Sequence, residues 1–262
     1  MKESAFLLDD SYARDRAETL RNRERLSANH NLLYWYRRLY RDQFADLPAP
    51  PEQLSILEIG SGTSPLFQFY PNVRTSDVLP LDYLDYSFDC HDIDQFKAIP
   101  DASLDVLTLT NVLHHLKQPI IFLKRAAAKL KPGGRVIATE PFFSLLSSPI
   151  FNYLHHEPVD FSIGEPELSE VLGPLRSANI ALPWLIFFKR SKWRDQLRET
   201  FEFDTKSYQP FSFISYMATG GISRCLPIPS IIYRILFDID LAASRALPKV
   251  FASFFTITLT RK

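Results

Sequence analysis

The chain has 262 residues, enough for one large α/β domain, and its 30 basic residues balance its 30 acidic ones. A net charge of zero argues against bulk binding to nucleic acid, because that affinity comes from neutralised phosphates. The two cysteines, Cys90 and Cys225, form neither a zinc spacing nor a disulfide framework. With no apolar signal-peptide core and no run of 18 apolar residues, we expect a cytoplasmic protein.

The first 50 residues are predicted to form a helical leader or cap. Residues 12–44 contain no Gly or Pro and carry apolar side chains at helical spacing, which predicts one helix. Eight arginines from Arg14 to Arg41 are interleaved with acidic residues. That mixture favours the solvated face of an amphipathic helix over a basic arm for RNA. A proline-rich stretch at 47–51 ends the leader.

Beyond the leader, short apolar strands alternate with helices. Strands are predicted at 54–59, 73–78, 83–90, 104–109 and 135–139, with a helix at 119–130 that a Lys-Pro-Gly-Gly turn ends. A helix at 230–247 and a strand at 251–260 follow near the end. This rhythm predicts a Rossmann-like α/β fold with a mostly parallel seven-stranded sheet and helices on both faces.

The long stretch after the fifth strand does not repeat this rhythm. We divide the chain into a cofactor-binding half at 51–141, an insertion at 142–198 that covers the acceptor site, and a completion of the sheet at 199–262. Many of the 21 phenylalanines fall after residue 141. They predict an apolar cover for a hydrophobic or lipid-linked acceptor, with peripheral membrane contact. Packing within an auxiliary core or a homodimer interface is the alternative.

The loop after the first predicted strand carries the clearest ligand signal. In open parallel sheets, ligands bind beyond the carboxyl ends of the strands. Scarce glycines mark positive φ or close approach, and Gly60 and Gly62 lie in this loop. Asp77 follows Glu58 by 19 residues, a spacing that suits both hydroxyls of a ribose. A structural turn with an accidental acid is the alternative.

The same loop excludes two common nucleotide sites. A dinucleotide fingerprint needs a third glycine where this chain has Pro65, and no Gly-Lys-Ser/Thr follows to make a P-loop. The remaining pattern suits a ligand with ribose and adenine but no phosphates. S-adenosylmethionine is the common ligand of that kind.

The order of the motifs from 54 to 141 resembles class I S-adenosylmethionine-dependent methyltransferases of the type 11-like group. It runs Leu-Glu-Ile-Gly-Ser-Gly at 57–62, Ser-Asp at 76–77, Asp-Cys-His-Asp at 89–92, Asn-Val-Leu-His-His-Leu at 111–116, Leu-Lys-Pro-Gly-Gly-Arg at 130–135 and Glu-Pro at 140–141. The His-His-Glu-Pro-Val-Asp segment at 155–160 looks like a bacterial subfamily of that group.

The resemblance implies S-adenosylmethionine as cofactor and a set of contacts to it. Two departures are Ser64 in place of the third loop glycine and a long stretch after Asp89, which leaves Asp92 as an alternative at the adenine. The implied contacts are Glu58, Gly60, Ser61 and Gly62 at the methionine and ribose, Asp77 at the ribose hydroxyls, Asp89 and Cys90 at the adenine, Asn111 beside the cofactor, and Val78 as a further cofactor contact.

Two histidine pairs are the candidates for acceptor chemistry. The pairs at 114–115 and 155–156 lack the i, i+4 spacing of helical metal ligands, so we predict no metal site. They either cap loops or act as an acceptor-side base or orienter. His155 and His156 are favoured as catalytic, followed by His114, with Glu140 and Asp160 as secondary candidates.

The predicted function is methyl transfer to oxygen or carbon of a small or lipid-linked hydrophobic acceptor. A non-catalytic methyltransferase-like subunit is the alternative, although Glu58, Gly60, Gly62 and Asp77 are all intact. An RNA methyltransferase is disfavoured by the neutral charge and by the absence of a Pro-Pro-Tyr-type motif.

Overall fold

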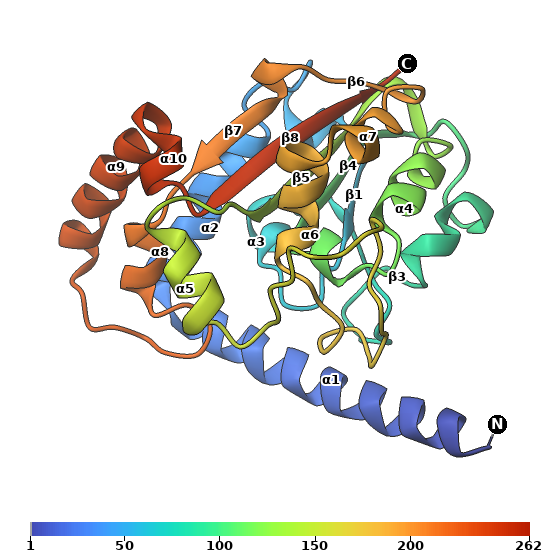
Figure 1. The fold of residues 1–262 in the computed structure, drawn as a ribbon, viewed down its shortest axis with the longest axis horizontal. Coiled ribbons are helices and arrows are strands. Elements are labelled where there is room, and N and C mark those ends of the chain that lie inside the picture. The colour runs from blue at the N-terminus through green and yellow to red at the C-terminus, as the bar shows by residue number, and fades with distance from the viewer. Residues whose placement is uncertain (1) are drawn as a thin grey trace.

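A computed structural model describes the backbone of residues 2–262 and the side chains of residues 12–262. One mixed sheet of eight strands forms its centre, in the order β3-β2-β1-β4-β5-β8-β6, with β7 also paired to β8 (Figure 1). The strands are β1 (Ile56–Ile59), β2 (Arg74–Asp77), β3 (Tyr86–Ser87), β4 (Leu104–Thr110), β5 (Leu130–Pro141), β6 (Phe201–Glu202), β7 (Tyr208–Phe211) and β8 (Phe254–Arg261).

The predicted Rossmann-like α/β class is confirmed. Strands β1 to β5 pair in parallel, and β8 runs antiparallel beside β5. The sheet has eight strands where seven were expected, because two short strands, β6 and β7, share the far side of β8.

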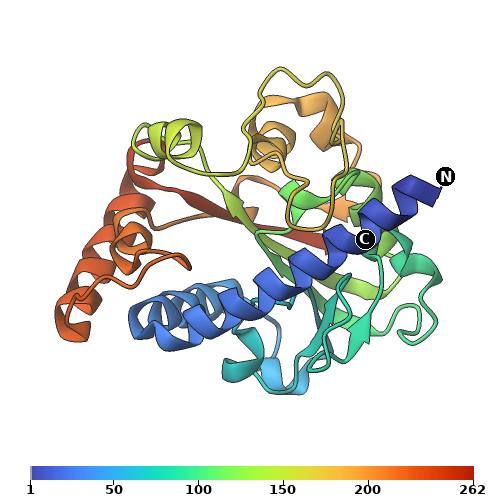
Figure 2. The same ribbon diagram turned by 90° about the horizontal axis from the view of Figure 1, so that it is seen from below.

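Alternating side chains send the strands into two cores, one on each face of the sheet. Neighbours such as Ile56 and Leu57 lie in different cores, as the two-residue period of a strand requires. On one face pack α4 (Pro119–Ala126), α6 (Ala181–Trp184), the π-helical turn Leu185–Lys189 and α7 (Ser191–Asp195). On the other pack α2 (His30–Gln43), α8 (Ile214–Thr219) and α9 (Ser230–Ala246) (Figure 2).

The N-terminal region is two helices and not the single one predicted. Asn29 adopts an extended conformation, and its side chain accepts a hydrogen bond from the Leu32 N–H, which starts α2 afresh after α1 (Lys2–Ala28). Leu32, Trp35 and Leu39 of α2 are fully buried, so this helix is a layer of the fold. α1 extends along one edge of the molecule (Figure 1).

Two other local predictions were wrong. The strand expected at 83–90 is reduced to β3, because Asp89 caps a 3-10 helix (Cys90–Gln95) by accepting the His91 N–H. The Lys-Pro-Gly-Gly segment lies inside β5. A Cβ on Gly134 would lie 3.0 Å from the Leu104 oxygen, so the glycine lets β5 pass close to β4.

Short helices fill the connections, and the segment at 142–198 divides in two. Its first part holds α5 (Ser147–Tyr153) and a long loop, whereas α6 to α7 pack in the core. Among the described residues, no helix is both long and apolar enough to cross a bilayer. The other short helices are Pro51–Gln53, α3 (Leu66–Phe69), η3 (Leu113–His115), Thr205–Ser207 and α10 (Pro248–Phe251).

Candidate active site

A cavity of about 1580 Å³ lies beyond the carboxyl ends of β1, β2 and β4. Its wall includes the glycine loop after β1, Asp77 and Val78 at the end of β2, and Asn111 after β4. Side chains of α1, including Tyr12 and Thr19, also contribute to the wall. The structure therefore brings most of the predicted cofactor residues to one cavity, and it adds α1, which the sequence did not place there.

The two glycines of the loop are needed for different reasons. Gly60 has a positive φ of 77°, and a Cβ there would lie 2.4 Å from Cγ2 of Val112. Gly62 has no positive φ, but a Cβ there would lie 2.8 Å from Cγ2 of Thr19 and 2.9 Å from Oδ2 of Asp77. A side chain at either position would displace a neighbouring part of the cavity wall.

Asp77 is held in place by backbone donors. Its Oδ2 accepts the Gly62 N–H and its Oδ1 accepts the Leu79 N–H, both at 3.0 Å. Burial raises the pKa of this carboxyl. A carboxylate has about four acceptor positions, so about two remain for hydroxyl groups of a ligand in the cavity.

Glu58 and Ser61 lie behind the cavity surface. Ser64, which lines the cavity, donates its hydroxyl to Oε1 of Glu58, while Oε2 is buried without a hydrogen-bond partner. Ser61 accepts the Ser76 N–H, and its hydroxyl donates to the Glu58 backbone oxygen, so it joins β1 to β2. Ser64 therefore lines the cavity at the position where the sequence predicted Glu58 to contact the cofactor.

Asp89, Cys90 and Asp92 all line the far part of the cavity. Asp89 bonds the His91 ring at 2.8 Å, and this hydrogen bond lowers the pKa of its carboxyl. Asp92 faces Arg125 at 3.5 Å. Asp89 and Asp92 therefore both stay candidates for the adenine contact.

Asn111, directly after β4, has an unusual backbone conformation and an unpaired side-chain oxygen. It has a positive φ of 57°, which is uncommon for a residue other than glycine, and its N–H donates to the Thr139 oxygen at 2.8 Å. Its side-chain Oδ1 is buried without a partner, although the residue lines the cavity. Unpaired buried acceptors are costly, so this atom fits a ligand that carries a donor.

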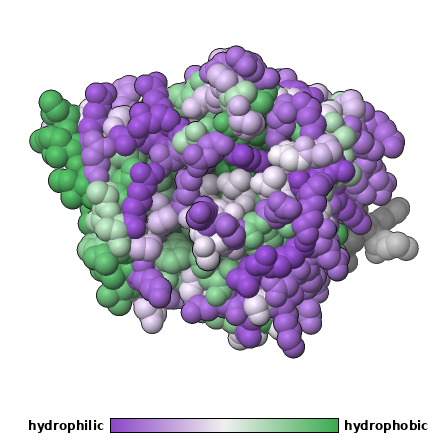
Figure 3. Space-filling view, turned by 90° about the horizontal axis from the view of Figure 1, so that it is seen from above, coloured by the Kyte–Doolittle hydropathy of each residue, from purple (hydrophilic) through white to green (hydrophobic). Residues whose placement is uncertain are grey.

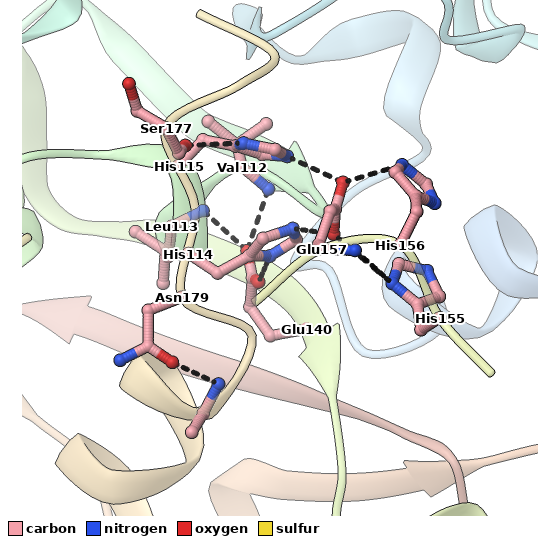
Figure 4. A network of polar contacts seen from close by, with 11 residues as sticks. Val112, Leu113, His114, His115, Glu140, His155, His156, Glu157, Ser177 and Asn179 are labelled. Carbon is pink, nitrogen blue, oxygen red and sulfur yellow. Dashed lines mark hydrogen bonds and ion pairs between the residues drawn. The ribbon is translucent and has the colours of Figure 1, made fainter. Parts of the chain in front are cut away.

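A network of histidines and carboxylates forms another part of the wall (Figure 4). Buried Glu140 of β5 accepts the N–H groups of Val112 and Leu113 at 2.9 and 2.6 Å, and it bonds Nδ1 of His114 at 2.6 Å. Nε2 of His114 lies 3.4 Å from Glu157. The sequence had offered Glu140 as an acceptor-side candidate, but it serves here as a buried support.

Glu157 is the centre of this network. Its carboxylate lies 3.5 Å from Nε2 of His115 and 3.8 Å from the rings of His155 and His156. His155 also accepts the Glu157 N–H at 3.2 Å, whereas His156 is largely exposed. Asp160 does not join the group, because its carboxylate turns to the N–H and hydroxyl of Ser162.

The network gives two adjacent histidines, His114 and His115, different protonation states. Burial alone would lower the pKa of His114, but Glu140 and Glu157 outweigh it and raise the pKa to about 10. Burial and the charge on His114 lower the pKa of His115 to about 4. Burial opposes ionisation of Glu157, but His114 and His115 lower its pKa to about 2. The centre at neutral pH is a carboxylate beside one charged and one neutral imidazole.

The arginines of α1 contact the protein itself. Arg23 donates to the backbone oxygens of Gly62 and Ser64 at 3.5 and 3.4 Å and stacks over Tyr83 at 4.1 Å. Arg16 donates to the Pro80 oxygen at 3.1 Å. These contacts hold α1 against the loops that follow β1 and β2.

The family model described as "Methyltransferase domain" matches residues 32–203, more than half of the chain. The chain belongs to this methyltransferase family. Membership makes S-adenosylmethionine the cofactor that the family implies for this chain. The matched range contains the glycine loop, Asn111 and the whole histidine–carboxylate network.

Individual relatives of this methyltransferase are distant. It is 30% identical over 108 residues to Thiol S-methyltransferase TMT1B of Rattus norvegicus, a match that covers 35% of this chain and 44% of the rat protein. The chain thus spans less than half the length of that relative. Two solved structures are similar. A SAM-dependent methyltransferase from Archaeoglobus fulgidus gives a TM-score of 0.47 at 13% identity, and the match covers 86% of this chain and 94% of that one. An S-adenosylmethionine-dependent methyltransferase from Mesorhizobium loti gives a TM-score of 0.45 at 14% identity, with 85% of this chain and 97% of that one covered.

The buried carboxyl of Glu58 gives this methyltransferase a testable pH dependence. Burial raises the pKa of Glu58 to about 7, above the usual 4.5 of an exposed glutamate. The folded state therefore keeps a proton that the unfolded state loses, and stability falls as pH rises from about 4.5 through 7. Glu58→Gln removes this loss, so we expect the variant to gain roughly 3 kcal/mol over the wild type between pH 4.5 and pH 8.

Urea unfolding of both proteins at several pH values measures this difference. Glu52→Gln, an exposed glutamate of the same region, is the matched control and should follow the wild type. A constant difference between Glu58→Gln and the wild type across this range would show that Glu58 is ionised at all of these pH values.

Proposed function

We propose that this methyltransferase transfers the methyl group of S-adenosylmethionine to a small or lipid-linked apolar acceptor. The observation that carries the proposal is the two-part wall of the cavity. One part holds the glycine loop, Asp77 and Asn111, and the other is formed by apolar side chains of α5, α8 and the segments beside them. The apolar residues are Ile150, Phe151, Leu154, Phe213, Met217, Ile222, Leu226 and Phe254.

In this proposal the polar part binds the cofactor. The backbone at Gly60 and Gly62 approaches the methionine and ribose, with Glu58 acting behind Ser64 and Ser61 fixing the shape of the loop. The remaining contacts go to the ribose, the adenine and the region of the methyl group. They come from Asp77 and Val78, from Asp89 with Cys90, and from Asn111, all of which line the cavity.

The chemistry requires alignment more than acid–base help. S-adenosylmethionine supplies an activated methyl group on sulfur, and holding an acceptor in line with it is worth about 7–11 kcal/mol in favourable cases. An O–H or S–H acceptor must also lose a proton. We assign this role to His155 and His156, whose rings flank Glu157 and line the cavity, while Glu157, ionised beside His114, holds them in place.

An exposed apolar face supports delivery of the acceptor from a membrane surface. The side of α9 that faces away from the core carries Ile231, Ile232, Ile235 and Ile239, whose exposed fractions are 56–73%. Figure 3 shows a hydrophobic area at the left edge of the molecule, where α9 lies. Arg234 of the same helix is exposed and can meet an anionic headgroup, at about 1 kcal/mol per basic residue near the surface, whereas Arg245 is paired with Asp42. The cytoplasmic location stays a prediction.

Co-sedimentation with vesicles tests the membrane part of the proposal. We expect the wild type to pellet with vesicles of anionic lipid and to pellet less with neutral ones. Ile235→Asp places a charge in the apolar face and should remain in the supernatant. Gln53→Asp adds the same charge at an exposed position outside α9, so this control should pellet like the wild type. A wild type that stays in the supernatant and elutes as a dimer would make this face a homodimer interface.

A panel of acceptors tests the catalytic part. Apolar thiols and phenols are compared with polar compounds that carry the same acceptor atom, using radiolabelled S-adenosylmethionine. Thiols are included because the rat relative is named as a thiol S-methyltransferase. We expect kcat/KM at least about tenfold higher for the apolar member of each pair, since about two buried methylenes are worth that much. Faster methylation of the polar members would contradict the proposal.

A further inference from the structure

Three side chains from two separate segments converge on one point of the cavity wall. His114 and His115 belong to the turn η3, and Glu157 belongs to the loop after α5 (Figure 4). Nε2 of His114 lies 3.4 Å from Oε2 of Glu157, and Nε2 of His115 lies 3.5 Å from Oε1. One nitrogen or oxygen from each of the three residues lies within 4.8 Å of the others.

The outer nitrogens of both histidines are already engaged. Nδ1 of His114 bonds Oε2 of Glu140 at 2.6 Å, and Nδ1 of His115 bonds the backbone oxygen of Ser177 at 2.9 Å. Histidines that bind metal almost always donate their other ring N–H to a carboxylate or a backbone carbonyl. Here both rings have such a partner, so both Nε2 atoms are directed towards Glu157, and a bound metal ion would displace the proton from Nε2 of His114.

The spacing also matches the size of an ion. Ligand atoms of a tetrahedral zinc site lie about 3.3–3.4 Å apart when the bonds to the metal are about 2.0–2.1 Å long. The two Nε2 atoms lie 3.4 and 3.5 Å from Glu157, each from a different carboxylate oxygen, which is close to this separation. Two histidines and one carboxylate are a ligand set that zinc accepts, and such sites keep a fourth position open for water or substrate.

We propose that His114, His115 and Glu157 bind a divalent transition-metal ion of the zinc class, with one coordination position open to the cavity. The spacing that argued against a metal applies to ligands on one helix, whereas these residues come from two segments. All three line the cavity that contains the glycine loop. If the proposed function holds, the ion faces the acceptor and would lower the pKa of a bound hydroxyl or thiol.

Calorimetric titration with Zn²⁺ tests the site on full-length protein that has been treated with a chelator and desalted. We expect one ion per chain for the wild type and a rise in melting temperature with added Zn²⁺. His115→Gln and Glu157→Gln each remove a ligand and should weaken Zn²⁺ binding at least tenfold. Glu140→Gln, which replaces the charged outer partner of His114 with an amide, should weaken it by about 10–100-fold.

Exposed His30→Gln is the matched control and should bind Zn²⁺ like the wild type. His91→Gln tests the other group of potential ligands, Asp89, Cys90 and His91. No binding to the wild type, or binding that is lost in His91→Gln and kept in His115→Gln, overturns the proposal. Titration of the same samples with S-adenosylhomocysteine distinguishes a failure of the metal site from a failure of the proposed methyltransferase function. If only the metal site is wrong, S-adenosylhomocysteine still binds.

Discussion

Glu140→Ala is expected to destabilise the folded protein by about 3–5 kcal/mol, the usual effect of removing one partner of a buried ion pair. Glu140 is fully buried, and its carboxylate is the acceptor for the N–H groups of Val112 and Leu113 and for the ring of His114. Alanine leaves all three donors without this acceptor. The charge on His114 would then be balanced by Glu157 alone.

The effect should depend on pH. The pKa of His114 is raised to about 10, so its ion pairs contribute fully below the ordinary value near 6.5 and lose their contribution as the pH rises through 10. The difference between wild type and variant should therefore be largest near pH 6 and smaller at pH 10. Urea unfolding with a chelator present measures it, and exposed Glu170→Ala is the control. A difference below about 1 kcal/mol at pH 6 would show that Glu140 does not support this network.

Glu157→Gln is expected to lower kcat by about 10²–10⁴-fold, the range for loss of proton transfer by a positioned group. The carboxylate lies in the cavity wall within 3.8 Å of four imidazoles, and the amide lacks the charge that holds the rings of His155 and His156 in position to take up the acceptor's proton. The affinity for S-adenosylhomocysteine should not change, because Glu157 lies outside the group of residues proposed to hold the cofactor.

Single-turnover kinetics at several pH values measure this loss once an acceptor is found. Glu165→Gln makes the same chemical change at an exposed position of the same loop and should leave kcat unchanged. A kcat for Glu157→Gln that equals the wild-type value, with the protein still folded, would remove Glu157 from the catalytic group. An equal loss of cofactor affinity would instead point to a collapsed cavity.

The sequence predicted the parts of the fold and site that depend on local patterns. Short apolar runs identified most of the strands, and the loop between Glu58 and Pro65 identified the carboxyl end of β1, where the cavity lies. Asp77 ends β2 and Asn111 follows β4, the two strands that flank β1 in the parallel part of the sheet. Their side chains therefore had to reach the same edge, and both line the cavity.

The remaining features depend on loop paths, which leave no periodic signal in a sequence. His115 and Glu157 are 42 positions apart, and only the course of the segment after β5 brings them together. The break at Asn29 comes from its local cap on the Leu32 N–H, which the helical spacing did not reveal, and its side-chain amide also donates at 2.9 Å to the oxygen of Thr219, 190 residues away. The place of α1 on the cavity wall likewise follows from contacts such as that of Arg23 with Gly62.

The most direct test of the account is a calorimetric titration of the purified protein with S-adenosylmethionine and S-adenosylhomocysteine. We expect dissociation constants on the order of micromolar, and no binding of NAD. Asp77→Ala should weaken binding by about 1–3 kcal/mol, because hydrogen bonds from ligand hydroxyls to a charged acceptor are lost. Tight binding of NAD without S-adenosylmethionine, or an Asp77→Ala variant that loses thermal stability while keeping full affinity, would contradict the cofactor site described above.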